Sequence, residues 1–127
     1  MSVTKKFFEN KNTKLTKSGK SMTLRIALEM LENAYASRSN DPYIIDSIGW
    51  AYFLVGQYEK AENFLKRAVE LMPEDPIVND HYGDILWKLN RKIQARYFWQ
   101  YVLKLEETED EMKKNIKEKL IDGIKQS

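Results

Sequence analysis

The chain repeats its own pattern of residue types every 34 residues. Asp41-Pro42 returns as Asp75-Pro76, and Gly49 returns as Gly83. One position of the pattern holds an alanine in three successive units: Ala27, Ala61 and Ala95. A fixed period of this length indicates supersecondary units stacked on one another, and it argues against a single layered domain.

Each unit of the pattern predicts a pair of helices with a defined start and a close crossing. Asp41 and Asp75 each precede a proline, and an aspartate N-cap followed by proline is a strong signal for a helix start. Gly49 and Gly83 fall inside the helices that follow, where glycine costs about 1 kcal/mol relative to alanine. We therefore expect the second helix of each pair to cross closely at these glycines, small residue against small residue, with the recurring alanine in the matching position.

Apolar residues at helical spacing predict a single helix at about 22–37 and then two helix pairs, at 42–55 with 58–71 and at 76–89 with 92–105. The predicted fold is all-α: a helical solenoid of about five helices, made of a half repeat, two full repeats and a C-terminal capping helix. Residues 21–127 would form this repeat domain. Residues 1–20 would form a basic, flexible arm. Six lysines against Glu9 give this segment a net charge of +5, whereas the whole chain has a net charge of +2.

The capping helix is predicted at 109–125. It follows Thr108-Glu109-Asp110-Glu111, which has the spacing of a capping box, a serine or threonine with a glutamate three residues later. Its expected buried stripe is Met112, Ile116, Leu120, Ile121 and Ile124. Four lysines are expected outside the stripe, namely Lys113, Lys114, Lys117 and Lys119. An amphipathic end helix with a charged outer face closes the open end of a stack.

Composition and motifs disfavour several classes of protein. The chain has no cysteine, which removes disulfides and thiolate chemistry. It has neither an apolar run of the ~20 residues that a membrane span needs nor the apolar core of a secretory signal. Motifs for phosphate loops, serine hydrolases and zinc proteases are lacking. We therefore expect no enzyme, no cofactor and no membrane partner, and a cytoplasmic location for this sequence.

The spacing of residue types within the period is more specific. The first unit has Ile45, Ile48-Gly49, Tyr52, Ala61, Leu65 and Pro73, and the second has Tyr82-Gly83, Leu86, Ala95 and Trp99. This order of large apolar, small, aromatic, small, bulky and proline resembles the tetratricopeptide repeat family, bacterial type, over roughly residues 20–125. The sequence is compatible with a whole repeat protein or with the C-terminal end of a longer one.

The resemblance implies a function. In that family the first helices of successive pairs line a concave groove that takes extended or helical peptides. The implied lining is Tyr43, Asp46, Trp50, Phe53 and Leu54 from the first pair, and Ile77, Asp80, His81, Asp84, Trp87 and Lys88 from the second. Chaperone-adaptor members hold a C-terminal carboxylate there with lysine and asparagine, whereas this chain has mostly aspartate, so a carboxylate clamp is disfavoured. The expected partner is a protein or peptide with apolar and basic residues.

Other interpretations stay open. Trp50 and Phe53 could be covered by the preceding helix or by the arm. The half repeat at 22–37 could drive self-association, for example as a homodimer. Asp80, His81 and Asp84 share a helix face and could hold a metal ion or move a proton, although a solvated helix face is the simpler interpretation. The lysine-rich arm could touch nucleic acid, but no arginine cluster or aromatic platform accompanies it, which makes nucleic acid an unfavoured partner.

Overall fold

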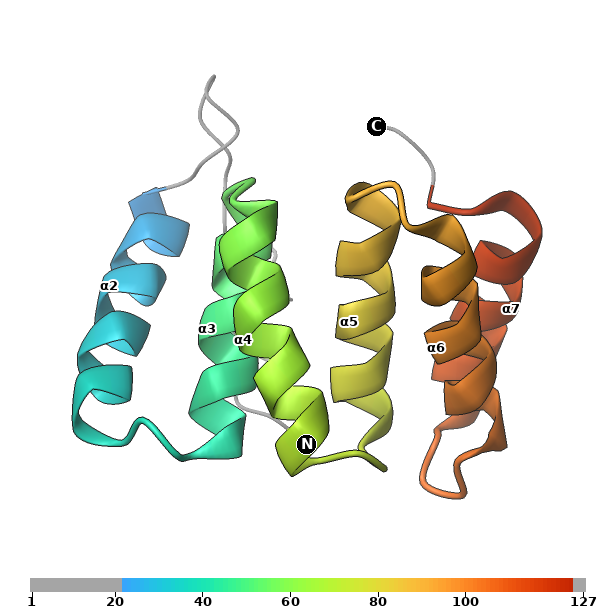
Figure 1. Cartoon of the computed structure of the whole chain (residues 1–127), viewed down its shortest axis with the longest axis horizontal. Helices are drawn as coiled ribbons and strands as arrows, with labels where there is room; N and C mark the ends of the chain where they lie inside the picture. The colour runs from blue at the N-terminus through green and yellow to red at the C-terminus, as the bar shows by residue number, and fades with distance from the viewer. Residues whose placement is uncertain (1–21, 125–127) are drawn as a thin grey trace. The chain divides into compact units, whose positions relative to one another are not determined.

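The computed structural model describes residues 22–124 (Figure 1), and within them all regular structure is helical. The helices are α2 (Met22–Ser37), α3 (Pro42–Leu54), α4 (Tyr58–Leu71), α5 (Pro76–Lys88), α6 (Lys92–Lys104) and α7 (Asp110–Asp122). The predicted all-α repeat fold is confirmed. The count of five is wrong, because one single helix, two pairs and an end helix form six separate elements in the described residues. The predicted arm lies outside the described residues.

The described residues divide into two compact units, at 22–68 and 69–124. The first unit contains α2, α3 and most of α4, and the second contains α5, α6 and α7. No helix within residues 22–124 has both the length and the apolar character needed to cross a bilayer.

Both predicted aspartate caps form. The Asp41 carboxylate accepts hydrogen bonds from the backbone N–H of Tyr43 at 2.9 Å and of Ile44 at 3.4 Å. The Asp75 carboxylate accepts one from the backbone N–H of Val78 at 3.0 Å. Because the first N–H groups of a helix have no partner within the helix, these carboxylates fix the starts of α3 and α5 one residue later, at a proline in each case.

The close crossings at the two glycines are also confirmed, but their chemistry differs from the prediction. A Cβ atom on Gly49 would lie 2.9 Å from Cβ of Phe64 and would overlap the Leu65 side chain. A Cβ atom on Gly83 would lie 2.6 Å from Cδ1 of Trp99. The glycines therefore make room for bulky side chains of the second helix. The predicted alanine is also close at the second crossing, where the Ala95 carbonyl oxygen would lie 3.3 Å from a Cβ atom on Gly83.

Each unit has its own apolar core. In the first, Ile45, Ile48 and Leu65 are at most 1% exposed, and the Phe64 ring lies against Tyr35 and Tyr52 at centroid distances of 5.2 and 5.6 Å. In the second, the buried cluster is Leu86, Ala95, Trp99, Val102 and Ile116. Ile116 is the fully buried residue of α7 and anchors that helix to the pair formed by α5 and α6.

Three expectations about α7 are wrong. Thr108 does not cap it: the helix starts at Asp110 without a side-chain cap, and the buried Thr108 hydroxyl donates instead to the Val102 carbonyl near the end of α6 at 2.6 Å. Ile121 is 78% exposed and does not belong to the buried stripe. Lys119 does belong to it, since it lies between Ile116 and Gly123 at helical spacing, and only a fifth of its side chain is exposed.

Candidate functional site

The accessible candidates of the first pair are aromatic side chains on α3. Trp50 and Phe53 stack with ring centroids 4.5 Å apart and planes 20° apart, and both are half-buried. Tyr43, on the first turn of the same helix, is 54% exposed. Phe53 also contacts Tyr58 at the start of α4, with centroids 5.5 Å apart. These contacts leave α3 with an aromatic surface that is held in place and still reachable from solvent.

The remaining candidate residues differ in exposure. Asp46 is fully buried, and His81 is 8% exposed, so neither side chain lies on an open surface. Leu54, Ile77 and Lys88 are half-buried. The predicted lining therefore contains reachable aromatic and aliphatic side chains together with buried polar ones.

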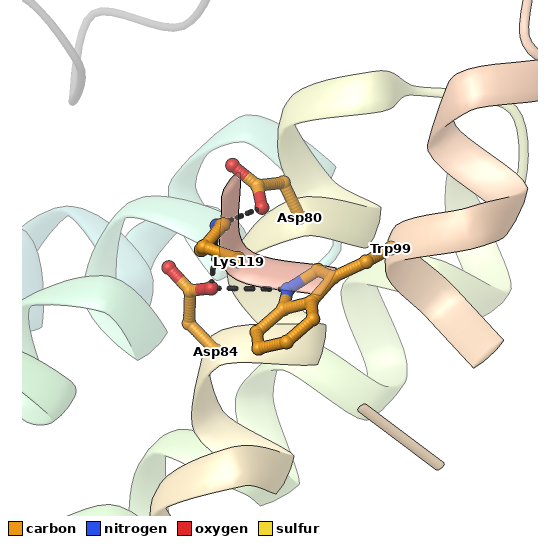
Figure 2. A network of polar contacts seen from close by, with 4 residues as sticks. All are labelled: Asp80, Asp84, Trp99 and Lys119. Atoms are coloured by element: carbon orange, nitrogen blue, oxygen red, sulfur yellow. Dashed lines mark hydrogen bonds and ion pairs between the residues drawn. The ribbon is translucent and has the colours of Figure 1, made fainter. Parts of the chain in front are cut away.

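Asp80 and Asp84 are joined by a lysine that was expected on the outside of the end helix (Figure 2). Nζ of Lys119, on α7, lies 2.5 Å from Oδ1 of Asp80 and 2.7 Å from Oδ1 of Asp84. Trp99, on α6, donates its Nε1–H to the same oxygen of Asp84 at 3.1 Å. One small network therefore connects all three helices of the second unit.

The network has unusual electrostatics because its members are largely withdrawn from water. Burial and, to a smaller extent, the nearby carboxylate of Asp80 raise the pKa of Asp84 to about 6, against the opposing effect of Lys119 and His81. For Lys119, burial by itself lowers the pKa, but the two carboxylates outweigh it and the pKa is raised. At neutral pH the stable arrangement is an ammonium group held between two carboxylates.

Trp87 takes part in the packing of the same unit. Its ring stacks on Trp99 with centroids 5.4 Å apart, and the Lys92 ammonium lies 4.8 Å from its centroid. Gly123, which ends α7 with φ of +70°, lies so close that a Cβ atom there would overlap the ring. Trp87 is thus half-buried between the end of α7 and the second helix of its pair.

Lys119, Trp99 and Gly123 were not predicted as members of this region. One signal could have identified Lys119: residues 116, 119, 120 and 123 follow the i, i+3, i+4, i+7 spacing of a buried helix face. A lysine on such a face needs a buried acidic partner, because an unpaired buried charge is very costly.

A metal site at Asp80, His81 and Asp84 is not what the structure forms. Lys119 occupies the position between the two carboxylates that a cation would take. Within residues 22–124, no group of three or more histidine, aspartate or glutamate side chains is arranged to hold a metal ion. The cluster is therefore an internal ion-pair network.

Replacing Asp84 with asparagine is expected to remove a pH dependence of stability between about pH 4 and 6. The folded pKa of about 6 lies above the ordinary value of 3.8, so the folded state binds more protons than the unfolded state in this window. The contribution of this carboxyl group to stability therefore falls as pH rises, by up to about 1–3 kcal/mol.

The measurement for Asp84→Asn is the free energy of unfolding of both proteins at pH 4 and pH 7. Relative to the variant, the wild-type chain should be more stable at pH 4 than at pH 7. Asparagine keeps an oxygen that can accept from Trp99, so the change removes the charge more than the shape. A difference that stays constant with pH would contradict the raised pKa.

Comparison with known proteins finds a family model that matches one of the two helix pairs. Residues 42–75, which span α3 and α4, match the family model of the tetratricopeptide repeat. A solved structure of MamA, residues 41 to the end, from Desulfovibrio magneticus RS-1 is 28% identical with a TM-score of 0.61, over 68% of this chain and 49% of that one. MamA AMB-1 is 21% identical with a TM-score of 0.58, over 76% of this chain and 56% of that one, and this likeness concerns the fold alone.

This chain therefore spans about half the length of the solved proteins that it resembles. No curated protein matches the sequence significantly.

Proposed function

We propose that this chain, a tetratricopeptide-repeat protein by its repeat at 42–75 and its helix pairs, is a non-catalytic interaction module. It would bind a protein or peptide partner that carries apolar and basic residues. The observation that carries the proposal is the stacked pair of Trp50 and Phe53 on α3, with the exposed Tyr43 on the same helix. Large aromatic side chains that stay reachable on a rigid helix commonly anchor protein partners.

The expectation of basic residues on the partner is supported by the charge of the network formed by Asp80, Asp84 and Lys119. Lys119 compensates one of the two carboxylates of Asp80 and Asp84, which leaves a net charge of −1 when both are ionised. Their side chains retain 19% and 16% exposure. A basic residue of a partner would gain orientation and association rate from this charge, and the effect should weaken with salt.

Replacing Trp50 with alanine is expected to weaken partner binding by about 2 kcal/mol or more, which is roughly 30-fold in Kd. Asp84→Lys is unsuitable as a test, because it would place a second cation against Lys119 and damage the fold. The probe is a synthetic peptide library that combines aliphatic or aromatic anchors with arginine and lysine. Binding is measured by fluorescence anisotropy, and helicity by circular dichroism.

The matched control for Trp50→Ala is Tyr97→Ala, which removes a 64% exposed aromatic ring from α6. It should leave the affinity of the selected peptides unchanged. Equal affinities of the wild-type chain and a folded Trp50→Ala variant would show that the α3 surface is not the binding surface.

A second candidate function, self-association, is favoured by the surface of α2. Met22, Ile26 and Met30 form a stripe of i, i+4 and i+8 spacing and are 66%, 51% and 61% exposed. Met30 holds the repeat position of Phe64 and Phe98, which pack on Tyr52 and Tyr82 of their own first helices. Burying such a stripe against a second copy would remove exposed apolar surface.

The helix that would cover this stripe in register is residues 8–20, which lie outside the described residues and whose sequence lacks the apolar pattern. Sedimentation equilibrium over a range of concentrations tests the second candidate. Self-association through α2 predicts a mass that rises with concentration and returns to that of the monomer in Ile26→Glu.

A further inference from the structure

The end helix α7 stands at the start of a third repeat. The first helices of the two complete pairs begin at Pro42 and Pro76, and α7 begins at Asp110, again 34 residues later. Their N-caps follow the same step, at Asp41, Asp75 and Glu109. By register, α7 is thus a first helix that is not followed by a second helix in the described residues, which end at 124.

In both complete pairs the second helix lies on the same face of the first. On α5 this face contains Gly83, which lies under Trp99, and Trp87, whose ring stacks on Trp99. On α3 it contains Gly49, under Leu65, and Phe53, which contacts Tyr58. The equivalent positions of α7 are those of Lys117 and Ile121, so these two residues mark the face where a second helix would sit.

This face of α7 is open and carries lysines. Ile121 is 78% exposed, and Lys117 is exposed as well. A shallow depression runs along the face, lined by Asp110, Lys113, Lys114, Lys117, Glu118 and Ile121. Three lysines and two acidic residues share this lining, so its formal net charge is +1.

The lysines on this face of α7 limit which helices or chain segments can bind to it. Lys117 stands where the complete pairs have a glycine that cannot take even a Cβ atom, so an apolar helix cannot approach as closely as α4 or α6 does. The exposed stripe of α2 in a second copy is apolar and would bury the lysine charges without a partner. The segment 1–20, with a net charge of +5, would be repelled.

We propose that this face of α7 docks an acidic amphipathic helix of a partner protein, at the place that a second helix takes in the complete pairs. Carboxylates of that helix pair with Lys113, Lys114 and Lys117, and one of its apolar side chains covers Ile121. The lysine side chains hold the partner helix at a wider spacing than that of the glycine crossings. This surface is separate from the aromatic surface of α3 and does not depend on it.

The test uses the full chain and a pair of synthetic helix-stabilised peptides of the length of α4. One peptide has leucine and alanine on one face, flanked by glutamates four residues apart, and the other has lysine in place of each glutamate. Binding is followed by NMR titration at low and high salt. The acidic peptide should shift the backbone amides of residues 113–121, and its affinity should fall as salt rises.

The variant Lys113→Glu/Lys117→Glu should weaken the acidic peptide by about tenfold or more and should bind the lysine peptide instead. Lys104→Glu, at an exposed lysine on α6, is the matched control and should bind the acidic peptide like the wild-type chain. Absence of binding by the acidic peptide, equal binding by the wild-type chain and the double variant, or shifts confined to other helices would overturn the proposal. A second copy as the occupant would instead appear as a mass increase that the double variant abolishes, and this also overturns it.

Discussion

Replacing Lys119 with methionine is expected to destabilise the second unit by about 3–5 kcal/mol, the usual cost of removing one partner from a buried ion pair. Methionine fills much of the same space, so the loss comes mainly from charge. Without the ammonium group, the carboxylates of Asp80 and Asp84 remain close together and largely withdrawn from water, at side-chain exposures of 19% and 16%. Their mutual repulsion and their lost hydration then act against the folded state.

The measurement is guanidinium unfolding followed by circular dichroism and by tryptophan fluorescence, since Trp99 touches the network. Lys117→Met, two residues earlier on the exposed face of α7, is the matched control and should change the free energy of unfolding by less than about 0.5 kcal/mol. Adding Asp80→Asn and Asp84→Asn to Lys119→Met should restore most of the lost stability, because no buried charge is left unpaired. A loss that persists in the triple variant would assign the effect to packing.

This network also shows which contacts could not be predicted from the sequence. The start of each pair could be predicted because its cause is local: the aspartate accepts from backbone N–H groups two or three residues later, and the proline between them favours the first helical turn. The close crossings could be predicted because a glycine inside a helix needs a packing reason. Both features also recur with the period, so each unit supports the interpretation of the other.

Lys119 could not be predicted in the same way, because its partners lie 35 and 39 residues earlier in the chain. Asp80 and Asp84 look like open acidic side chains in the sequence, and a pattern of charges does not say which of them face another helix. The same holds for Thr108, whose hydroxyl has a competing acceptor at Val102 that spacing alone does not reveal. The aromatic surface of α3 was predicted by resemblance, and its role in binding stays a prediction.

Replacing Gly83 with leucine is expected to cost more than about 3 kcal/mol, at or beyond the upper end of ordinary overpacking. The first atom of the new side chain would already lie 2.6 Å from Cδ1 of Trp99, which is fully buried and fixed through its Nε1–H to Asp84. The ring can move only by breaking this hydrogen bond and its stacking on Trp87. The better helix propensity of leucine returns less than about 1 kcal/mol.

The control for Gly83→Leu is Lys117→Leu, which puts the same side chain at the same repeat position of α7, where the face is open. Thermal unfolding should show a large loss for Gly83→Leu and little change for Lys117→Leu, although the latter adds exposed apolar surface. Gly83→Ala should fall between them, because its single added carbon meets the indole ring without the further bulk of leucine. Similar melting temperatures for the two leucine variants would mean that the residue at this repeat position does not set the helix spacing. Lysine in place of glycine at position 117 would then no longer explain why the face of α7 stays open to a partner helix.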